Sequence, residues 1–204
     1  SPNIPDIESV FCYMATGLGE GTGIRMGDKF KWIGGPGIDS VKFAELLNGA
    51  GLPGVKYIPE DMGSLGGVRL QITDYRTFNP VKSGLYALAY ARQLTGFKVP
   101  KSGSTPASVV MFDKIMGTDR VGKWLEQNLS PQEIESLYAA ELEAFKKERK
   151  QYLIYGYAGK PGQIGVTVDG VVIFFDSEPY IDENNRTMVP VRFISEALGA
   201  VVGW

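Results

Sequence analysis

Apolar and polar residues alternate most strictly between residues 68 and 73. Val68, Leu70 and Ile72 fall on one face there, and the positions between them are polar. A period of two residues is typical of a strand with one buried face. Shorter apolar runs predict three further strands, at residues 8–14, 29–33 and 55–57.

Helical spacing with start and stop signals predicts helices between and after these strands. Ser40 is a candidate N-cap for a helix whose apolar residues recur at i, i+3, i+4 and i+7, and Gly51 ends it. Asn79 is a second N-cap, followed by Pro80 in the first turn, and that helix ends at Gly96. Two shorter helices are predicted next, one opened by Pro106 and one over residues 119–128.

A long helix is predicted after residue 130. Ser130 and Glu133 form a capping box at its start, and Glu143 and Lys147 can pair across one turn. Its apolar side chains share one stripe, made by Ile134, Leu137, Tyr138, Leu142 and Phe145.

The pattern changes near residue 163. Alternating apolar residues flank Asp169 and Gly170, which are typical of a hairpin turn, and another turn is predicted over residues 183–185. A short helix is predicted over residues 191–198, with Gly199 after it.

These elements predict two domains. Strands alternate with helices over residues 1–155, which predicts an α/β domain with a mixed sheet flanked by helices. Residues 156–162 form a glycine-bearing linker, and residues 163–204 predict a small, incomplete α+β domain. We expect the chain to be a fragment at both ends, because residues 1–5 are typical of an interdomain entry and a new strand begins at Trp204.

Composition narrows the chemistry of the chain. The net charge is -2, which argues against a nucleic-acid partner, and no apolar run approaches the roughly 20 residues of a membrane span. The chain has no histidine, which removes Ser-His-Asp and Cys-His catalysis and histidine-containing zinc sites. Its single cysteine, Cys12, cannot form an intramolecular disulfide. We expect no metal and no cofactor.

Two glycine patterns resemble nucleotide-binding motifs and fail on register. The loop over residues 17–23 lacks G-x-G-x-x-G spacing, and Trp124 stands where Ser or Thr must follow G-x-x-x-x-G-K. Within that loop, Glu20 lies among glycines, which let a backbone approach a ligand. A carboxylate there can bind sugar hydroxyls, and a flexible surface loop is the alternative.

Three other residues are candidates for sugar binding. Asp74 follows the alternating strand, at a position where α/β proteins often place functional groups, and the alternative is a carboxylate that braces the next turn. Arg25 can clamp a carboxylate and Trp32 can stack on a sugar, although each residue type is more often structural.

Short segments in a fixed order make residues 3–155 resemble a known family. They are SPNIP at 1–5, GEGT at 19–22, GPGID at 35–39, LPGV at 52–55, FNP at 78–80 and GTD at 117–119. This ordered set is similar to the C-terminal domain of the NamZ-type peptidoglycan exo-β-N-acetylmuramidases.

The resemblance implies removal of N-acetylmuramic acid from the non-reducing end of peptidoglycan fragments. It also implies that the catalytic carboxylate belongs to a Rossmann-like N-terminal domain missing from this chain, so the catalytic residues are unknown. Glu20, Gly21 and Thr22 match the E-G-T segment that faces the active site in this family. With Arg25 and Asp74 they are the expected substrate-binding residues. Two stretches depart from the family by being shorter, at residues 23–30 and 60–66.

Residues 163–204 carry VDG at 168–170, PYI at 179–181, RTMVPVRFI at 186–194 and EALGA at 196–200. This set resembles the copper amine oxidase N-terminal-like domain. The resemblance implies an accessory cell-wall module and no copper chemistry. Both resemblances imply a bacterial protein that is extracellular or associated with the cell wall.

Three functions stay open. The first is the auxiliary half of a secreted peptidoglycan glycosidase, which acts on muramyl sugars together with the missing N-terminal domain. The second is a non-catalytic cell-envelope module. The third, a self-sufficient enzyme that uses Asp74 and Glu20, is disfavoured.

Overall fold

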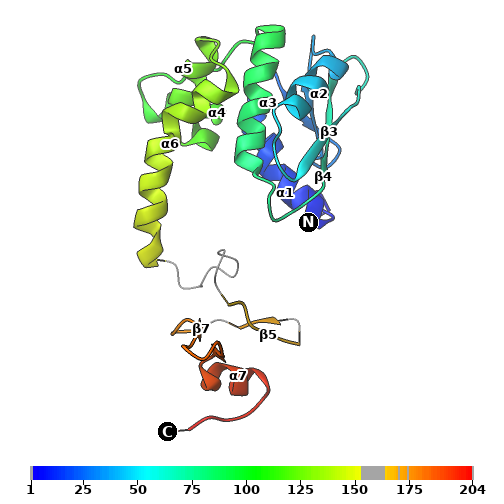
Figure 1. Cartoon of the computed structure of the whole chain (residues 1–204). Helices are drawn as coiled ribbons and strands as arrows, with labels where there is room; N and C mark the ends of the chain where they lie inside the picture. Colours follow the sequence, from blue (N-terminus) through cyan, green and yellow to red (C-terminus); the bar gives the residue numbers. More distant parts are fainter. Residues whose placement is uncertain (1, 153–163, 170, 174, 204) are drawn as a thin grey trace. The chain divides into compact units, whose positions relative to one another are not determined.

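The computed structural model divides the chain into two compact units, Ser1–Ala140 and Glu141–Trp204 (Figure 1). The structure describes residues 2–152, 164–169, 171–173 and 175–203. The predicted linker, residues 156–162, lies outside the described residues. The predicted domain limits at 155 and 163 therefore stay a prediction.

A sheet with the strand order β1-β2-β4-β3 forms the centre of the first unit. Its strands are β1 (Arg25–Gly27), β2 (Trp32–Gly35), β3 (Val55–Pro59) and β4 (Gly66–Ile72). Each of these neighbours pairs antiparallel. The alternation predicted for residues 68–73 is confirmed, because Val68, Leu70 and Ile72 are buried on one face.

Three helices cover that inner face of the sheet: α1 (Ile7–Thr16), α2 (Ser40–Gly49) and α3 (Pro80–Thr95). Helix α2 packs on β3 and β4, and α3 packs against both α1 and α2 (Figure 1). The largest side chains of the resulting core include Phe43, Leu47, Tyr57 and Leu88. The predicted α/β architecture with helices packed on a sheet is confirmed, but the sheet, which was expected to be mixed, is antiparallel throughout.

The outer face of the sheet has a small core of its own around Trp32. The pairing Gly34↔Gly67 lies next to the pairing of Trp32 with Arg69. A Cβ added to either glycine would come within 2.5 Å of the Trp32 ring, so the ring packs directly on the backbone of these two glycines. Trp32 is only 1% exposed. The loop between β3 and β4 completes this small core, since its Met62 approaches Gly27 beside the Trp32 ring.

The strand predicted at residues 8–14 is wrong, because these residues belong to helix α1. Asp6 caps the helix by accepting a 2.8 Å hydrogen bond from the Ser9 N–H. The buried positions of α1 are small, and α1 approaches α3 closely at Gly84, where an added Cβ would lie 2.4 Å from the carbonyl oxygen of Ala15. Val10 and Tyr13, two of the β-forming residues that suggested a strand, point outward instead, and Phe11 is half-buried against the core.

Two further predictions need correction in detail. Residues 28–31 form a turn between β1 and β2, whereas residues 29–33 were expected as one strand. Helix α2 is capped by Asp39, which accepts from the Lys42 N–H at 3.0 Å, and Ser40 is its first residue. The Ser40 hydroxyl instead accepts a 2.8 Å hydrogen bond from the Gly67 N–H.

The predicted limits of α3 are confirmed. The Asn79 side chain accepts from the Lys82 N–H at 3.0 Å, and Gly96 closes the helix in a left-handed conformation with φ 63°. The expected helix at Pro106 is a single 3-10 turn, η2 (Pro106–Ser108), followed by α4 (Met111–Met116). Helix α5 (Arg120–Glu126) fills the range predicted at 119–128.

Helix α6 (Pro131–Glu148) begins with the predicted capping box and is followed by η3 (Arg149–Tyr152). The Ser130 N–H donates to the Glu133 carboxylate at 2.7 Å, and the Glu133 N–H donates to the Ser130 hydroxyl at 3.2 Å. Ile134 is buried, whereas the rest of the predicted stripe is half-buried at Tyr138 and exposed at Leu137, Leu142 and Phe145. Glu143 pairs with Lys146 at 2.6 Å and not with Lys147 as predicted.

Residues 164–203 form two short hairpins and a helix. Strands β5 (Thr167–Val168) and β6 (Val171–Val172) flank the predicted turn at Asp169. Strands β7 (Tyr180–Ile181) and β8 (Thr187–Met188) flank the turn predicted at 183–185. Helix α7 (Val191–Ala197) follows, as predicted.

Candidate functional site

The glycine loop between α1 and β1 is held by its own threonine. It begins with the 3-10 turn η1 (Gly17–Gly19). The Thr22 hydroxyl donates to the Gly19 carbonyl oxygen at 2.6 Å and accepts from the Ile24 N–H at 3.0 Å. Such local side-chain bonds fix a turn without help from neighbouring segments. The loop therefore has a defined backbone.

The rear of the loop packs against two other segments. Gly21 has φ +79°, and a Cβ added there would lie 3.5 Å from the Phe112 backbone nitrogen at the start of α4. A Cβ added at Gly23 would come within 2.8 Å of the Phe97 side chain. Glycine is required at Gly21 by conformation and at Gly23 by the close approach.

The loop and the strand that follows it carry two exposed charges. Glu20 and Arg25 are both exposed. Among the described residues, neither side chain has a hydrogen bond or an ion pair. Both side chains are therefore available to a ligand, and each remains hydrated until one binds.

Asp74 lies elsewhere. Its carboxylate accepts from the Arg76 N–H and the Thr77 hydroxyl, each at 2.9 Å, and these hydrogen bonds hold its pKa below the ordinary value. In the sheet, Arg25 on β1 pairs with Gly34 on β2, which in turn pairs with Gly67 at the start of β4. Asp74 comes seven residues after Gly67, beyond the other end of β4, and this separation corresponds to about 23 Å at about 3.3 Å per residue. The structure brings Glu20, Gly21, Thr22 and Arg25 into one region and leaves Asp74 outside it.

Trp32 offers no face to a sugar. It is buried, and its indole N–H donates to the Glu60 carbonyl oxygen at 2.8 Å. Its role is to fill the outer face of the sheet.

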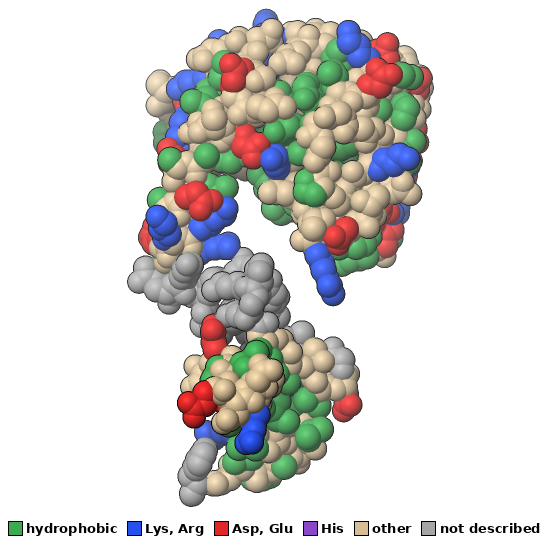
Figure 2. All heavy atoms as spheres, in the orientation of Figure 1, with side chains coloured by type: hydrophobic (Ala, Val, Ile, Leu, Met, Phe, Trp, Pro, Cys, Tyr) green, Lys and Arg blue, Asp and Glu red, His purple; other side chains and the backbone are tan. Residues whose placement is uncertain are grey.

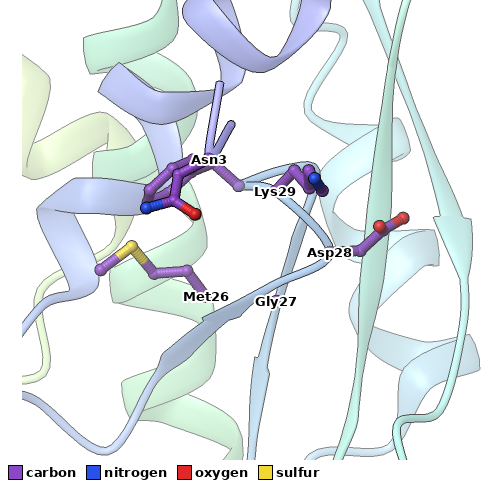
Figure 3. Close-up of a pocket in the computed structure, with 6 residues that line it drawn as sticks. Asn3, Met26, Gly27, Asp28 and Lys29 are labelled. Atoms are coloured by element: carbon purple, nitrogen blue, oxygen red, sulfur yellow. The ribbon is translucent and has the colours of Figure 1, made fainter. Parts of the chain in front are cut away.

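A pocket of about 310 Å³ was not anticipated from the sequence. It lies at the β1–β2 turn, and its lining is Asn3, Met26, Gly27, Asp28, Lys29 and Phe30 (Figure 3). Three consecutive residues of this turn have left-handed φ values of 41°, 56° and 71°. None of them is glycine, so the sequence carried no signal for this turn.

A second pocket, of about 180 Å³, lies between the segment before η2 and helices α4 and α5. Its charged residues are already partnered. Lys101 pairs with Glu126 at 2.9 Å and Lys123 pairs with Asp119 at 2.6 Å. The buried carboxylate of Asp113 accepts from the Ser102 hydroxyl at 2.5 Å.

The described residues contain no group of three or more metal-ligating side chains. None of the helices described here is long and apolar enough to cross a membrane. Acidic and basic side chains are intermixed on the face of the first unit that Figure 2 shows.

Comparison with known proteins gives two family matches. Residues 11–155 match the family model "Exo-beta-N-acetylmuramidase NamZ, C-terminal", and residues 159–204 match the copper amine oxidase N-terminal domain. The chain is 37% identical over 170 residues to the peptidoglycan beta-N-acetylmuramidase NamZ of Bacillus subtilis (strain 168). That match covers 76% of this chain and 39% of the relative.

A solved structure has the same fold. The crystal structure of a DUF1343 family protein from Bacteroides fragilis matches with a TM-score of 0.61 and 21% sequence identity, over 76% of this chain and 44% of that one. The chain thus spans less than half the length of either protein. From the family model and the Bacillus relative together, this chain belongs to the exo-β-N-acetylmuramidase NamZ C-terminal family.

Proposed function

We propose that this chain is the auxiliary, substrate-cleft half of a secreted peptidoglycan glycosidase of the exo-β-N-acetylmuramidase type. A preceding domain would supply the catalytic carboxylate, and residues 163–204 would be an accessory cell-wall module. One observation carries the proposal: Glu20 on the glycine loop and Arg25 at the start of β1 are exposed and unpaired within the described chain, and the backbone of the loop is fixed. This arrangement suits one wall of a cleft.

The chemistry of the loop fits a muramyl sugar. A carboxylate such as Glu20 accepts hydrogen bonds from sugar hydroxyls, and the guanidinium of Arg25 can pair with the lactyl carboxylate of muramic acid. Gly21 permits the left-handed backbone that the loop needs, and Thr22 keeps the turn closed. In this proposal Asp74 shapes its own turn and does not touch the sugar.

The similarity to a peptidoglycan beta-N-acetylmuramidase supports a role at the bacterial cell wall. We therefore propose peptidoglycan fragments as partners and a location outside the cytoplasm. The match of residues 159–204 favours a second candidate, a non-catalytic envelope module. Both candidates predict wall binding, but only the first predicts that Glu20 and Arg25 recognise muramic acid.

Sugar titration tests the proposal. N-acetylmuramic acid and small muropeptides are titrated into the 204-residue chain by calorimetry, with N-acetylglucosamine as the sugar without a carboxylate. Glu20→Ala should weaken the binding of both sugars about tenfold, since a hydrogen bond to a charged group contributes on the order of 1.5–3 kcal/mol. Arg25→Ala should weaken only the binding of the sugars that carry a carboxylate.

Two exposed residues of α2 provide matched controls. Glu45→Ala and Lys42→Ala remove one charge of each sign from a surface away from the loop and should bind as the unaltered chain does. If the unaltered chain binds neither muramyl sugars nor purified cell walls, the proposal is wrong. If it binds walls while both loop variants behave like the controls, the second candidate replaces the first.

A further inference from the structure

The outward face of α1 is apolar. Ile7, Val10 and Met14 recur at i, i+3 and i+7, with exposed fractions of 59%, 48% and 52%. The opposite face of the helix, around Cys12, is buried. A helix at a protein–water boundary normally places polar residues outward, and a helix that is apolar all round is normally covered on all sides. This outward stripe therefore departs from the usual pattern of a helix that faces solvent.

The stripe continues into the pocket at the β1–β2 turn. Tyr13, itself 45% exposed, meets Phe30 edge to face with 4.7 Å between ring centroids. Phe30 and Met26 line the pocket of about 310 Å³ (Figure 3). We call the helix stripe, Tyr13 and this pocket the α1 surface. An exposed apolar patch beside a pocket is typical of an interaction site.

The start of the chain is fastened beside the α1 surface. Lys29 Nζ donates to the Pro2 carbonyl oxygen at 2.9 Å, and Lys31 pairs with Asp6 at 2.7 Å. Asn3 itself lines the pocket, on the side of Met26. A polypeptide that precedes residue 2 would thus begin at the rim of this surface.

We propose that the α1 surface is the docking face for the N-terminal region of an exo-β-N-acetylmuramidase of this family. The matched family model is a C-terminal one, and this chain covers only 39% of the Bacillus relative. In such a protein, a region that precedes the matched one would enter at α1. Short tethers give a high local concentration, so even a modest apolar surface is then occupied. The inference rests on the proposed function, in which this chain and the N-terminal region act together as one enzyme.

Cysteine labelling tests the docking face. The 204-residue chain is compared with a chimera in which it replaces the matched C-terminal region of the Bacillus relative. Val10→Cys or Met14→Cys is introduced in each, and alkylation is followed peptide by peptide by mass spectrometry. Val41→Cys on α2, at a side chain 57% exposed, is the control. Cys12 does not interfere, because it is fully buried.

We expect both α1 cysteines to react readily in the 204-residue chain. In the chimera they should react at least about tenfold more slowly, because a cysteine on a docked face reacts only when the face opens. The control should react equally in both. Equal α1 labelling in the two proteins would overturn the proposal. Concentration-dependent protection in the 204-residue chain alone would also overturn it, because a second copy would then be the occupant.

A second variant keeps the test independent of the chimera. Val10→Lys with Met14→Lys in the 204-residue chain should leave its melting temperature nearly unchanged, since both side chains are about half exposed and a lysine can extend its ammonium into water. A clear drop would show that the face packs within this chain, and the proposal would be wrong. Labelling uses no sugar and sugar titration does not use α1, so this inference and the proposed function fail separately.

Discussion

The indole N–H of Trp32 donates a 2.8 Å hydrogen bond to the backbone carbonyl of Glu60. This bond holds the loop between β3 and β4 against the outer face of the sheet. The ring of Trp32 lies over Gly34 and Gly67. The two glycines leave room for the ring in the position from which its N–H reaches Glu60.

Gly67→Ala tests this arrangement. Its Cβ would lie 2.4 Å from the Trp32 ring and 2.5 Å from the Ile33 carbonyl oxygen, which cannot move without disturbing the sheet. Overpacking of this kind costs about 1–3 kcal/mol. Urea unfolding followed by circular dichroism measures the loss. Gly49→Ala is the control, because nothing lies within 4 Å of its Cβ, and the variant should be as stable or slightly more stable. Equal stability of the two variants would contradict the account.

Ser130→Ala tests the capping box of α6. The change removes the acceptor for the Glu133 N–H and leaves the first turn of the helix with an unpaired donor. We expect a loss of about 1 kcal/mol in the free energy of unfolding. Ser136→Ala is the comparison, because Ser136 lies on the same helix and donates only to the Glu133 carbonyl. A loss at Ser136 as large as at Ser130 would show that capping is not the cause.

Asp6 predicts how stability changes in acid. Hydrogen bonding from the Lys31 ammonium, and next from the Ser9 N–H, lowers the pKa of Asp6 from 3.8 to about 2. The folded state prefers the ionised form, so its stabilisation is fully present above 3.8 and is lost as the pH falls toward 2. Asp6→Asn retains an N-cap acceptor and removes the charge. The stability difference between the unaltered chain and this variant should therefore shrink over that interval.

Urea midpoints measured across the acid range check this expectation. Asp39→Asn is the matched control, since Asp39 caps α2 in the same way and has no ion pair among the described residues. A difference for Asp6→Asn that stays constant down to the lowest pH would argue against the Asp6–Lys31 pair.

Cys12 should resist alkylation. The side chain is fully buried, and burial raises the pKa of its thiol to about 12. Since the thiolate is the reactive species, iodoacetamide at neutral pH should modify Cys12 only after unfolding in denaturant. Rapid labelling of the folded chain would show that α1 opens readily.

The sequence predicted best where local chemistry decides structure. Asn79 with Pro80, and Ser130 with Glu133, fix helix starts through bonds within one turn, and both starts are confirmed. The alternation at Val68, Leu70 and Ile72 succeeded because these side chains are buried on the inner face of β4, whereas Arg69 and Gln71 between them are half-buried and exposed.

Helix α1 was missed because its packing reverses the usual pattern. Its buried side is made of small residues such as Cys12 and Ala15, which allow the close approach to Gly84. Most of its large residues, such as Val10, Tyr13 and Met14, face outward, so periodicity in large apolar residues misled the prediction. The Asp6 cap was a usable signal that the strand prediction overlooked.

A loop around Glu20 was predicted, and its sugar-binding role stays a prediction. The glycines indicated a backbone that a ligand can approach, whereas the structure places the start of α4 close to the backbone at Gly21. Their spacing could not show that Asp74 lies at the opposite end of β4 or that Trp32 is buried, because both facts depend on strand register. The left-handed turn that shapes the pocket consists of Asp28, Lys29 and Phe30, and none of them is a glycine that would have indicated this conformation.

Thr22, Gly21 and the start of α4 hold the glycine loop, and the side chain at position 20 takes no part in that support. Exchanging the side chain at this position should hardly change the thermal stability of the domain. Mutation can thus sample new side-chain chemistry at the loop tip while the scaffold stays intact, which makes position 20 a natural starting point for diversification among relatives and for laboratory evolution of altered selectivity.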